Sequence, residues 1–437
     1  MILYIDPGTG SMLFTILIGL FGTAVYFFRN LIMKLKFRTK GKVEVEDKIP
    51  LVIFSDHKRY WNVFEPICDE LEKREIDCVY MTESEDDPAL SKEYKHIEAR
   101  YIGTGNKAYA KMNMLKANVV LSTTPSLDVF QWKRSKEVDC YIHIAHAAND
   151  ITLYKMFGLD YYDAILLSGE YQVDQIRTLE QLRRLPEKDL ECVGIPYLDE
   201  MKKRFDAYDK KAKAKKESAD KDSKKNQSKD TSGEKTVLLA PSWGDNGILK
   251  KYGTRFLDEL VKTGYNIVIR PHPQSFTSEK EMIEELQKKY PESDKLSWNR
   301  DNDNFDILYK SDIMISDFSG VIFDYTLVFD KPVIYVPPEF DKSQYDAAWV
   351  DEELWTYEIL PAIGKELSEK DFPNIKNVID SCIDSEEYKV GRDKAREETW
   401  MYIGNGAVKT VDYIEKKLNK ENDTKTSVDK HTTVAMA

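Results

Sequence analysis

The feature of this chain that most constrains its fold is an alternation of short apolar runs with amphipathic segments, which occurs twice. In the first half the apolar runs, which predict strands, are residues 51–54, 78–81, 119–121, 139–144 and 164–167. After the first run, residues 61–74 have helical periodicity, with Val63, Phe64, Ile67 and Leu71 on one face. Strands that alternate with helices are typical of a mostly parallel sheet with helices on both faces.

The same alternation begins again after a polar stretch in the middle of the chain. It predicts strands and helices in turn over residues 236–240, 255–262, 265–270, 279–289, 312–315, 320–329 and 332–336, with a closing helix over 407–418. We therefore expect an α/β fold of two Rossmann-like, doubly wound domains that face each other across a cleft. Open parallel sheets bind ligands beyond the carboxyl ends of their strands, so the chemistry is expected in the strand-end loops.

A charged stretch separates the two halves. Residues 210–235 are rich in Lys, Asp, Ser and Ala and can bury too little apolar surface to fold. A polybasic membrane tether is the alternative, but the interleaved acidic residues favour a solvated linker. We thus expect a membrane anchor with its basic flank, an N-terminal domain, a charged flexible linker, a C-terminal domain and a disordered tail. Their predicted boundaries are 1–45, 46–205, 206–235, 236–420 and 421–437.

The N-terminal end predicts one transmembrane helix. No residue from Ser11 to Phe28 is charged, and this run reaches the ~18 apolar residues at which a spanning helix is expected. Arg29 and further basic residues up to Lys42 follow it, so the positive-inside rule places the rest of the chain in the cytoplasm. A signal peptide would carry its charges before the apolar run. A buried core helix or a re-entrant hairpin is the alternative.

Composition excludes several classes of function. The net charge of −12 argues against a nucleic-acid binder, which needs an electropositive face. The five cysteines are scattered and form no CxxC pair, so neither a disulfide framework nor a zinc site is indicated. The chain has no GxxxxGK[ST] motif, which argues against a P-loop enzyme. It also has no HExxH motif or close ladder of carboxylates that would mark a metal site.

Two histidines follow predicted strands. His146 lies in the sequence YIHIAHAAND, just beyond residues 139–144, and an imidazole that titrates near neutral pH is suited to general-base catalysis. A structural role is the alternative for a lone loop histidine. His272 lies between two prolines in RPHPQS, where the rigid backbone directs its side chain from a strand end. Arg270 beside it is a bidentate donor suited to phosphate.

Two further strand-end segments have residues that suit an anionic ligand. In APSWGDNG, Ser242 can cap a helix or reach a phosphate, although a simple turn explains the segment equally well. In SDFSG, the side chains of Ser316, Asp317 and Ser319 precede a predicted helix, and Gly320 lets a ligand approach the backbone closely. Ordinary helix capping is the alternative there and is compatible with anion binding.

In sequence order, the segments APSW, RPHP, SDFSG with its following Phe-Asp and Lys-Pro pairs, and YIGNGA resemble the CDP-glycerol glycerophosphotransferase family. Enzymes of this family prime or polymerise teichoic-acid-type polymers. The resemblance covers most of the second half, and in the first half it rests on His146 and the region of Asp163. It implies a GT-B fold, with the acceptor on the N-terminal domain and the nucleotide donor on the C-terminal domain.

The resemblance also implies roles for individual residues. An acceptor hydroxyl attacks the β-phosphorus of the donor and CMP leaves, with His146 as the base and His272 steadying the diphosphate. The turn from Ser316 to Gly320 holds the transferred phosphoryl group, which is coherent because phosphoryl transfer depends on positioning and charge stabilisation. The predicted donor- and phosphate-binding residues are Ser242, Trp243, Arg270, Ser316, Asp317, Ser319, Gly320 and Asp324.

Three positions depart from the family's pattern. Ala147 follows the first histidine where the family usually has glycine, and Gly244 follows Trp243 where it usually has arginine. Gly320 stands in place of a second serine. These departures leave the expected fold untouched but bear on the identity of the donor.

The sequence thus predicts a single-pass protein of the bacterial cytoplasmic membrane, with cytoplasmic catalytic domains. It would transfer glycerol phosphate from CDP-glycerol to a lipid-linked or polymeric cell-surface acceptor. Its expected partners are the bilayer, the CDP-linked donor and the polymer, and not nucleic acid; homo-oligomers are left open. No cofactor is obligatory, and the need for a divalent metal is undecided. The alternatives are a CDP-ribitol enzyme, a nucleotide-sugar glycosyltransferase and a catalytically silent membrane-bound assembly subunit.

Overall fold

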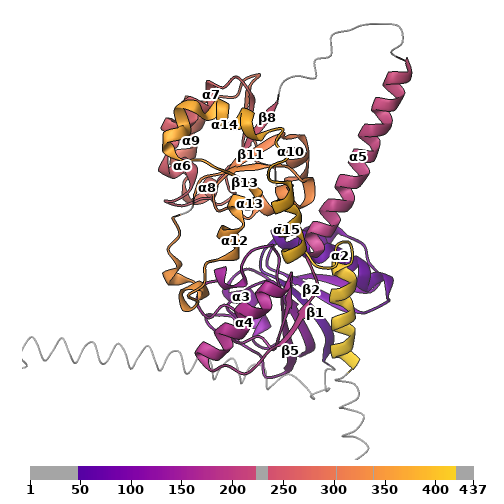
Figure 1. Ribbon diagram of the computed structural model, residues 1–437. Helices are drawn as coiled ribbons and strands as arrows, with labels where there is room; N and C mark the ends of the chain where they lie inside the picture. The colour runs from indigo at the N-terminus through magenta and orange to yellow at the C-terminus, as the bar shows by residue number, and fades with distance from the viewer. Residues whose placement is uncertain (1–47, 223–234, 302, 338, 420–437) are drawn as a thin grey trace, which may run out of the picture. The chain divides into compact units, whose positions relative to one another are not determined.

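The computed structural model describes residues 48–222, 235–301, 303–337 and 339–419 (Figure 1). The predicted membrane anchor, the end of the predicted linker and the predicted tail lie outside the described residues. Within the described ranges, no helix is both long enough and apolar enough to cross a membrane. The description below concerns residues 48–419, which belong to one compact unit.

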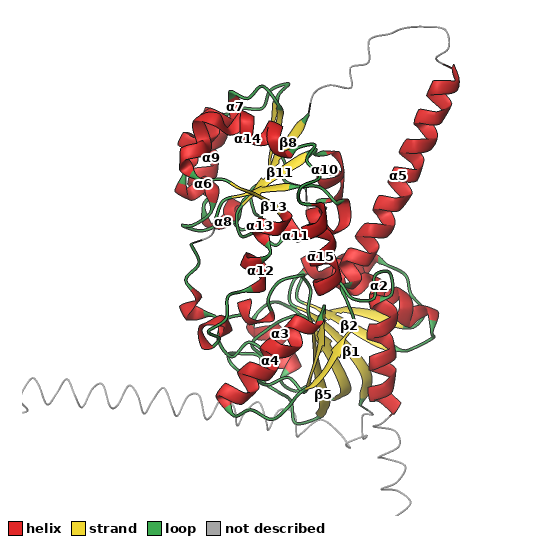
Figure 2. Ribbon diagram, viewed as in Figure 1, coloured by secondary structure: helices red, strands yellow, loops and turns green. Residues whose placement is uncertain are grey.

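The first half of the described chain forms a parallel sheet of seven strands (Figure 2). Their order is β3-β2-β1-β4-β5-β6-β7, the doubly wound arrangement that was expected. The strands are β1 (Ile49–Ser55), β2 (Cys78–Thr82), β3 (Ile97–Tyr101), β4 (Ala117–Ser122), β5 (Val138–Ile144), β6 (Ala164–Leu167) and β7 (Asp189–Cys192). The predictions missed β3 and β7 because these edge strands are polar and partly exposed, whereas the central strands are continuous buried apolar runs.

Helices connect the strands of this sheet and bury one apolar face each. They are α2 (Trp61–Lys73), α3 (Asn106–Met112) and α4 (Glu170–Arg183). In α2, Phe64, Ile67 and Leu71 have no exposed surface and pack against Leu51 and Ile53 of β1 in the same hydrophobic cluster. The predicted 61–74 helix is therefore confirmed, and its spacing of apolar residues is the reason that it covers the sheet.

The second half forms a separate parallel sheet of six strands in the order β10-β9-β8-β11-β12-β13. The strands are β8 (Thr236–Leu239), β9 (Asn266–Ile269), β10 (Leu296–Trp298), β11 (Ile313–Ser316), β12 (Val333–Tyr335) and β13 (Gly364–Glu366). Its helices are α6 (Ile248–Lys251), α7 (Gly253–Val261), α8 (Ser275–Ser278), α9 (Lys280–Lys289), α10 (Phe305–Lys310), α11 (Val321–Phe323), α12 (Trp355–Glu358), α13 (Leu360–Ile363), α14 (Ile375–Cys382) and α15 (Lys389–Thr399). Both halves are therefore Rossmann-like.

The predicted helix over 320–329 has an irregular form. A single turn, α11, is followed by a π-helical segment, η4 (Asp324–Val328). Single π-helical turns occur frequently at functional sites because the extra residue redirects the side chains around it. Asp324 is the first residue of this segment.

Two boundaries differ from the predicted segments. Helix α5 (Pro196–Asp222) continues well into the predicted flexible linker, so the linker's first part is helical. The predicted closing helix is present over residues 406–419, but it packs on the N-terminal half. Val411 and Ile414 are fully buried in the same cluster as the first sheet, and Arg74 of the first half pairs with Glu415 at 2.6 Å. The chain thus returns to its first domain after completing the second.

This topology places the predicted site residues together at strand ends. His146 follows β5, Ser242 follows β8, His272 follows β9, and the SDFSG segment begins at the last residue of β11. In the second sheet β8 and β11 are neighbours where the strand order reverses, which is where doubly wound sheets bind their ligands.

Candidate active site

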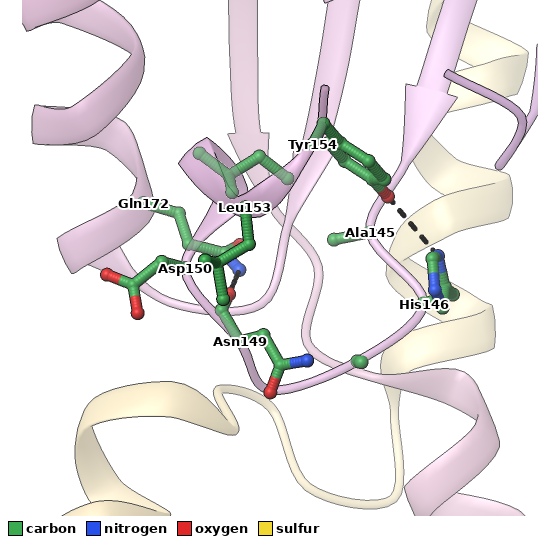
Figure 3. Close-up of a pocket in the computed structure, with 9 residues that line it drawn as sticks. Ala145, His146, Asn149, Asp150, Leu153, Tyr154 and Gln172 are labelled. Carbon is green, nitrogen blue, oxygen red and sulfur yellow. Dashed lines mark hydrogen bonds between the residues drawn. The ribbon is translucent and has the colours of Figure 1, made fainter. Parts of the chain in front are cut away.

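His146 lies on a loop that lines a cavity of about 150 Å³ (Figure 3). Its Nδ1 atom lies 2.8 Å from the hydroxyl of Thr123 and 3.2 Å from the hydroxyl of Tyr154. Thr123 follows β4, so the neighbouring strand supplies a partner for the ring. With Nδ1 engaged on one side, Nε2 is the nitrogen left for a substrate.

Burial and, to a smaller extent, the positive charge of Arg59 together lower the pKa of His146 to about 4. The imidazole is therefore neutral at pH 7, the state in which it can accept a proton. Arg59 comes from η1 (Lys58–Tyr60), directly after β1, and its guanidinium lies 5.0 Å from the centre of the Tyr60 ring. That ring lies 5.1 Å from the His146 ring, centre to centre.

The second strand-end histidine is His272, and one hydrogen bond defines its tautomer. Its Nδ1 accepts a hydrogen bond of 3.1 Å from the backbone N–H of Gln274. Because that nitrogen is an acceptor, neutral His272 carries its proton on Nε2 and can donate it to an anionic oxygen. Burial lowers the pKa of His272, and Arg59 and Arg270 lower it further. The exposed ring of Trp243 lies 6.5 Å away, centre to centre.

Arg59 is therefore a cation whose charge acts on histidines of both halves. Its side chain forms no ion pair with a carboxylate among the described residues. Arg59 was not predicted from the sequence, because the predicted strand-end residues were histidines and serines and a basic residue in SDHKRY has no distinguishing pattern. Its position after β1, a central strand at the point where the order of the first sheet reverses, was the available signal.

The side chains of Ser316 and Asp317, which were predicted to bind phosphate, have internal partners. The Ser316 hydroxyl donates to the carbonyl of Ala240 at 2.6 Å. The Asp317 carboxylate accepts the backbone N–H groups of Ser242 at 2.9 Å and Ile248 at 3.0 Å. These bonds hold the APSWGDNG loop against the SDFSG turn. Their role in the site is therefore to fix the two segments relative to each other. Burial raises the pKa of Asp317, and the two N–H groups oppose that shift.

Arg270 and Asp324 interact electrostatically, and each has further polar partners. Arg270 donates to the carbonyl of Asp301 at 2.7 Å and to the side chain of Asn299. Asp324 accepts hydrogen bonds from Tyr197 at 3.2 Å and Asn304 at 3.4 Å. Burial raises the pKa of Asp324 to about 7, and Asn304, Tyr197 and Arg270 oppose the shift. Both predicted ligand residues thus have protein partners, and their contact with a donor stays a prediction.

Ser319 and Gly320 complete the turn after β11. The Ser319 side chain is half-buried and has no hydrogen-bond partner among the described residues. Gly320 lies beside Asn149 of the HAAND loop: a Cβ atom placed on Gly320 would lie 3.2 Å from Asn149 Nδ2. The loop that carries His146 and the turn that carries Ser319 therefore meet.

A buried carboxylate in the same loop forms hydrogen bonds that connect the two halves. Asp150, which is 3% exposed, accepts the backbone N–H groups of Trp355 at 3.0 Å and Thr356 at 2.7 Å. Those residues begin α12 in the second half. Asn149 and Asp150 were not predicted from the sequence, although both lie within four residues of His146 in a strand-end loop. Within the described ranges, no group of three His, Cys, Asp or Glu residues could hold a metal ion.

The sequence matches the family described as CDP-Glycerol:Poly(glycerophosphate) glycerophosphotransferase over residues 35–406. The chain belongs to this family. It is accordingly a CDP-glycerol glycerophosphotransferase-like enzyme, a transferase of the teichoic-acid type, and the resemblance inferred from its motifs is confirmed. No curated protein matches it.

Solved structures with the same fold are distant in sequence. The wall teichoic acid polymerase TagF is 16% identical, with a TM-score of 0.55 over 93% of this chain and 99% of that one. A UDP-GlcNAc 2-epimerase from Neisseria meningitidis, bound to UDP-GlcNAc, is 13% identical, with a TM-score of 0.55 over 84% and 99%. An S. aureus MnaA–UDP structure is 14% identical, with a TM-score of 0.54 over 85% and 97%. These likenesses agree with two Rossmann-like domains of GT-B type.

Proposed function

We propose that this family member transfers glycerol phosphate from CDP-glycerol to a lipid-linked or polymeric cell-surface acceptor and releases CMP. The observation that carries the proposal is the pair of neutral histidines, His146 and His272, on strand-end loops of the two sheets, both under the charge of Arg59. Nε2 of His146 has no hydrogen-bond partner among the residues that the structure describes and can accept a hydroxyl proton, and His272 has an N–H for an anionic leaving group.

The proposed reaction is a displacement at the β-phosphorus of CDP-glycerol. The acceptor hydroxyl oxygen forms a new bond to that phosphorus, while the bond between the phosphorus and the bridging oxygen breaks and its electron pair leaves with CMP. The hydroxyl proton passes to Nε2 of His146. This requires the other proton of His146 to be on Nδ1, where the Thr123 hydroxyl at 2.8 Å accepts it.

The leaving CMP gains negative charge as the bond breaks, and His272 is placed to stabilise it. Its Nδ1 accepts a hydrogen bond from Gln274 N–H, so the neutral ring must carry its proton on Nε2. Arg59 adds a positive charge near both histidines. Preorganised donors and cations of this kind supply most of the catalysis in phosphoryl transfer, because there is little covalent chemistry for the protein to perform.

We also propose that the enzyme acts at the cytoplasmic face of a membrane. The support is the uncharged run from Ser11 to Phe28 followed by Arg29 and other basic residues. A membrane position would bring the catalytic domains to a lipid-linked acceptor. This part of the chain lies outside the described residues, so the proposal rests on the sequence.

The test is CMP release by the detergent-solubilised full chain from CDP-glycerol, with a lipid-linked glycerophosphate primer. We expect release that depends on donor and primer, and that falls by at least about 100-fold in His272→Ala, as for loss of one donor to a developing anion. His96→Ala is the matched control, because His96 is a surface histidine paired with Asp77. CMP from CDP-ribitol alone, or a nucleoside diphosphate from a nucleotide sugar, would refute the CDP-glycerol assignment.

A further inference from the structure

Asn149 occupies an unusual position between the two halves of the enzyme. Its backbone carbonyl accepts hydrogen bonds from the Tyr171 hydroxyl at 2.9 Å and from the Gln172 amide at 2.7 Å. Both donors come from α4, so the backbone of Asn149 is fixed to a regular element. Its side chain borders the same cavity as His146 (Figure 3).

The amide of Asn149 has no partner within the part of the chain that the structure describes. Its Oδ1 is shielded from solvent and accepts no hydrogen bond there. Rotating the amide by 180° would place two N–H donors in that shielded position, and unpaired buried N–H groups are rarer than unpaired acceptors. The observed orientation therefore leaves the Nδ2 amino group free to donate.

This amino group lies beside the turn from Ser316 to Gly320, which the family resemblance implies holds the transferred phosphoryl group. A Cβ atom on Gly320 would lie 3.2 Å from Asn149 Nδ2 and 3.8 Å from Oδ1. The first distance is tighter than an ordinary van der Waals contact. A serine at position 320 would therefore require the Asn149 amide to move by a few tenths of an ångström. The glycine at this position and the asparagine on the facing loop are thus sterically complementary.

We infer that Asn149 is a substrate-contacting residue: its Nδ2 amino group donates a hydrogen bond to the phosphoryl oxygen that a side chain at position 320 would otherwise reach. This inference rests on the proposed function. Gly320 stands in place of the second serine of the family's pattern, so the turn has no hydroxyl at this position. The Asn149 amide supplies a hydrogen-bond donor on the same side of the turn. A neutral amide held by a fixed backbone suits this task, since a preorganised donor stabilises developing charge without reorganising.

The test is a double-mutant cycle of Asn149→Ala and Gly320→Ser in the full chain, with the melting temperature and the rate of CMP release measured for each variant. Asn106→Ala is the matched control, because Asn106 is an exposed asparagine at the start of α3 with no side-chain hydrogen bond among the described residues. The donor is CDP-glycerol, with the lipid-linked glycerophosphate primer.

We expect Asn149→Ala to lower kcat about 100-fold, as for loss of one oxyanion-type donor, with a melting temperature near that of the wild type. Gly320→Ser alone should lower both activity and melting temperature, because the added Cβ crowds the Asn149 amide and shifts it from its position. The double variant should regain at least about 10-fold over Asn149→Ala, since the serine hydroxyl then has room to donate.

The outcomes separate this inference from the function on which it rests. An active wild type whose rate is unchanged in Asn149→Ala would overturn the role of Asn149 alone. So would a double variant no better than the product of the two single effects. A folded wild type that releases no CMP under any of these conditions would overturn the proposed function and this inference with it.

Discussion

Replacement of Arg59 by alanine tests the electrostatic coupling between the two halves. The guanidinium lies 5.0 Å from the Tyr60 ring, and that ring lies 5.1 Å from the His146 ring, so the charge is within about 10 Å of the imidazole. At an effective dielectric constant of ~20 to 40, two unit charges about 10 Å apart repel by about 1 to 2 kcal/mol. Arg59 is solvent-exposed, which favours the lower value.

The sign of the effect follows from the charge. A nearby cation disfavours the imidazolium ion, so the Arg59 charge lowers the pKa of His146, which is about 4 in the intact protein. Removing the charge should raise the pKa of His146 by about half to one unit, because one pKa unit corresponds to about 1.4 kcal/mol. His272 should shift in the same direction. In Arg59→Ala, the loss of activity on acidification should therefore begin at a higher pH.

The direct assay is an NMR titration of the histidine rings, since the chain contains only six histidines to assign. The pH dependence of kcat/KM for CMP release is the functional readout. Arg59→Lys should keep the wild-type titration because it keeps the charge, and high salt should reproduce part of the alanine effect. Lys58→Ala is the control, because that neighbouring cation pairs with Asp86. If His146 titrates within about 0.2 units of wild type in Arg59→Ala, the proposed coupling is refuted.

Three further predictions concern the supports of the site. Tyr154→Phe removes a hydroxyl that contacts both His146 and buried His143. It should lower the free energy of unfolding by about 1–3 kcal/mol, measured by denaturant titration. Tyr161→Phe, which changes an exposed ring, is the control and should leave the free energy of unfolding unchanged. Asp317→Ala leaves two backbone N–H groups without their acceptor, so it should lower both the melting temperature and the affinity for CDP-glycerol. A variant with an unchanged melting temperature would contradict the role of Asp317 in holding the loop. The pKa of Asp324 is raised to about 7, so the native state keeps a proton that the unfolded state releases above about pH 4. Stability should therefore fall as pH rises from about 4 to 7, and Asp324→Asn should remove that slope in melting curves.

Much of the fold could be predicted from the sequence because the central strands are apolar on both faces. Continuous runs such as residues 119–121 and 164–167 are recognisable without partners, and each became a fully buried strand. Edge strands such as β3 and β13 were missed, since a strand with one neighbour is part-exposed and its composition resembles that of a loop. The packing of residues 406–419 on the first sheet was also missed, because an amphipathic pattern shows that a face is buried but not what covers it.

The candidate site divides in the same way. The sequence by itself determined the residue types at the strand ends, His146, His272 and the SDFSG turn, because the end of an apolar run is a local signal. Only the tertiary structure decided that Ser316 and Asp317 bond to the neighbouring loop and that Asn149 faces Gly320. Those contacts join segments far apart in the chain, and their chemistry depends on distance and burial. Distances between these segments and the burial of their side chains are set only once both sheets have formed, so they cannot be inferred from local sequence patterns.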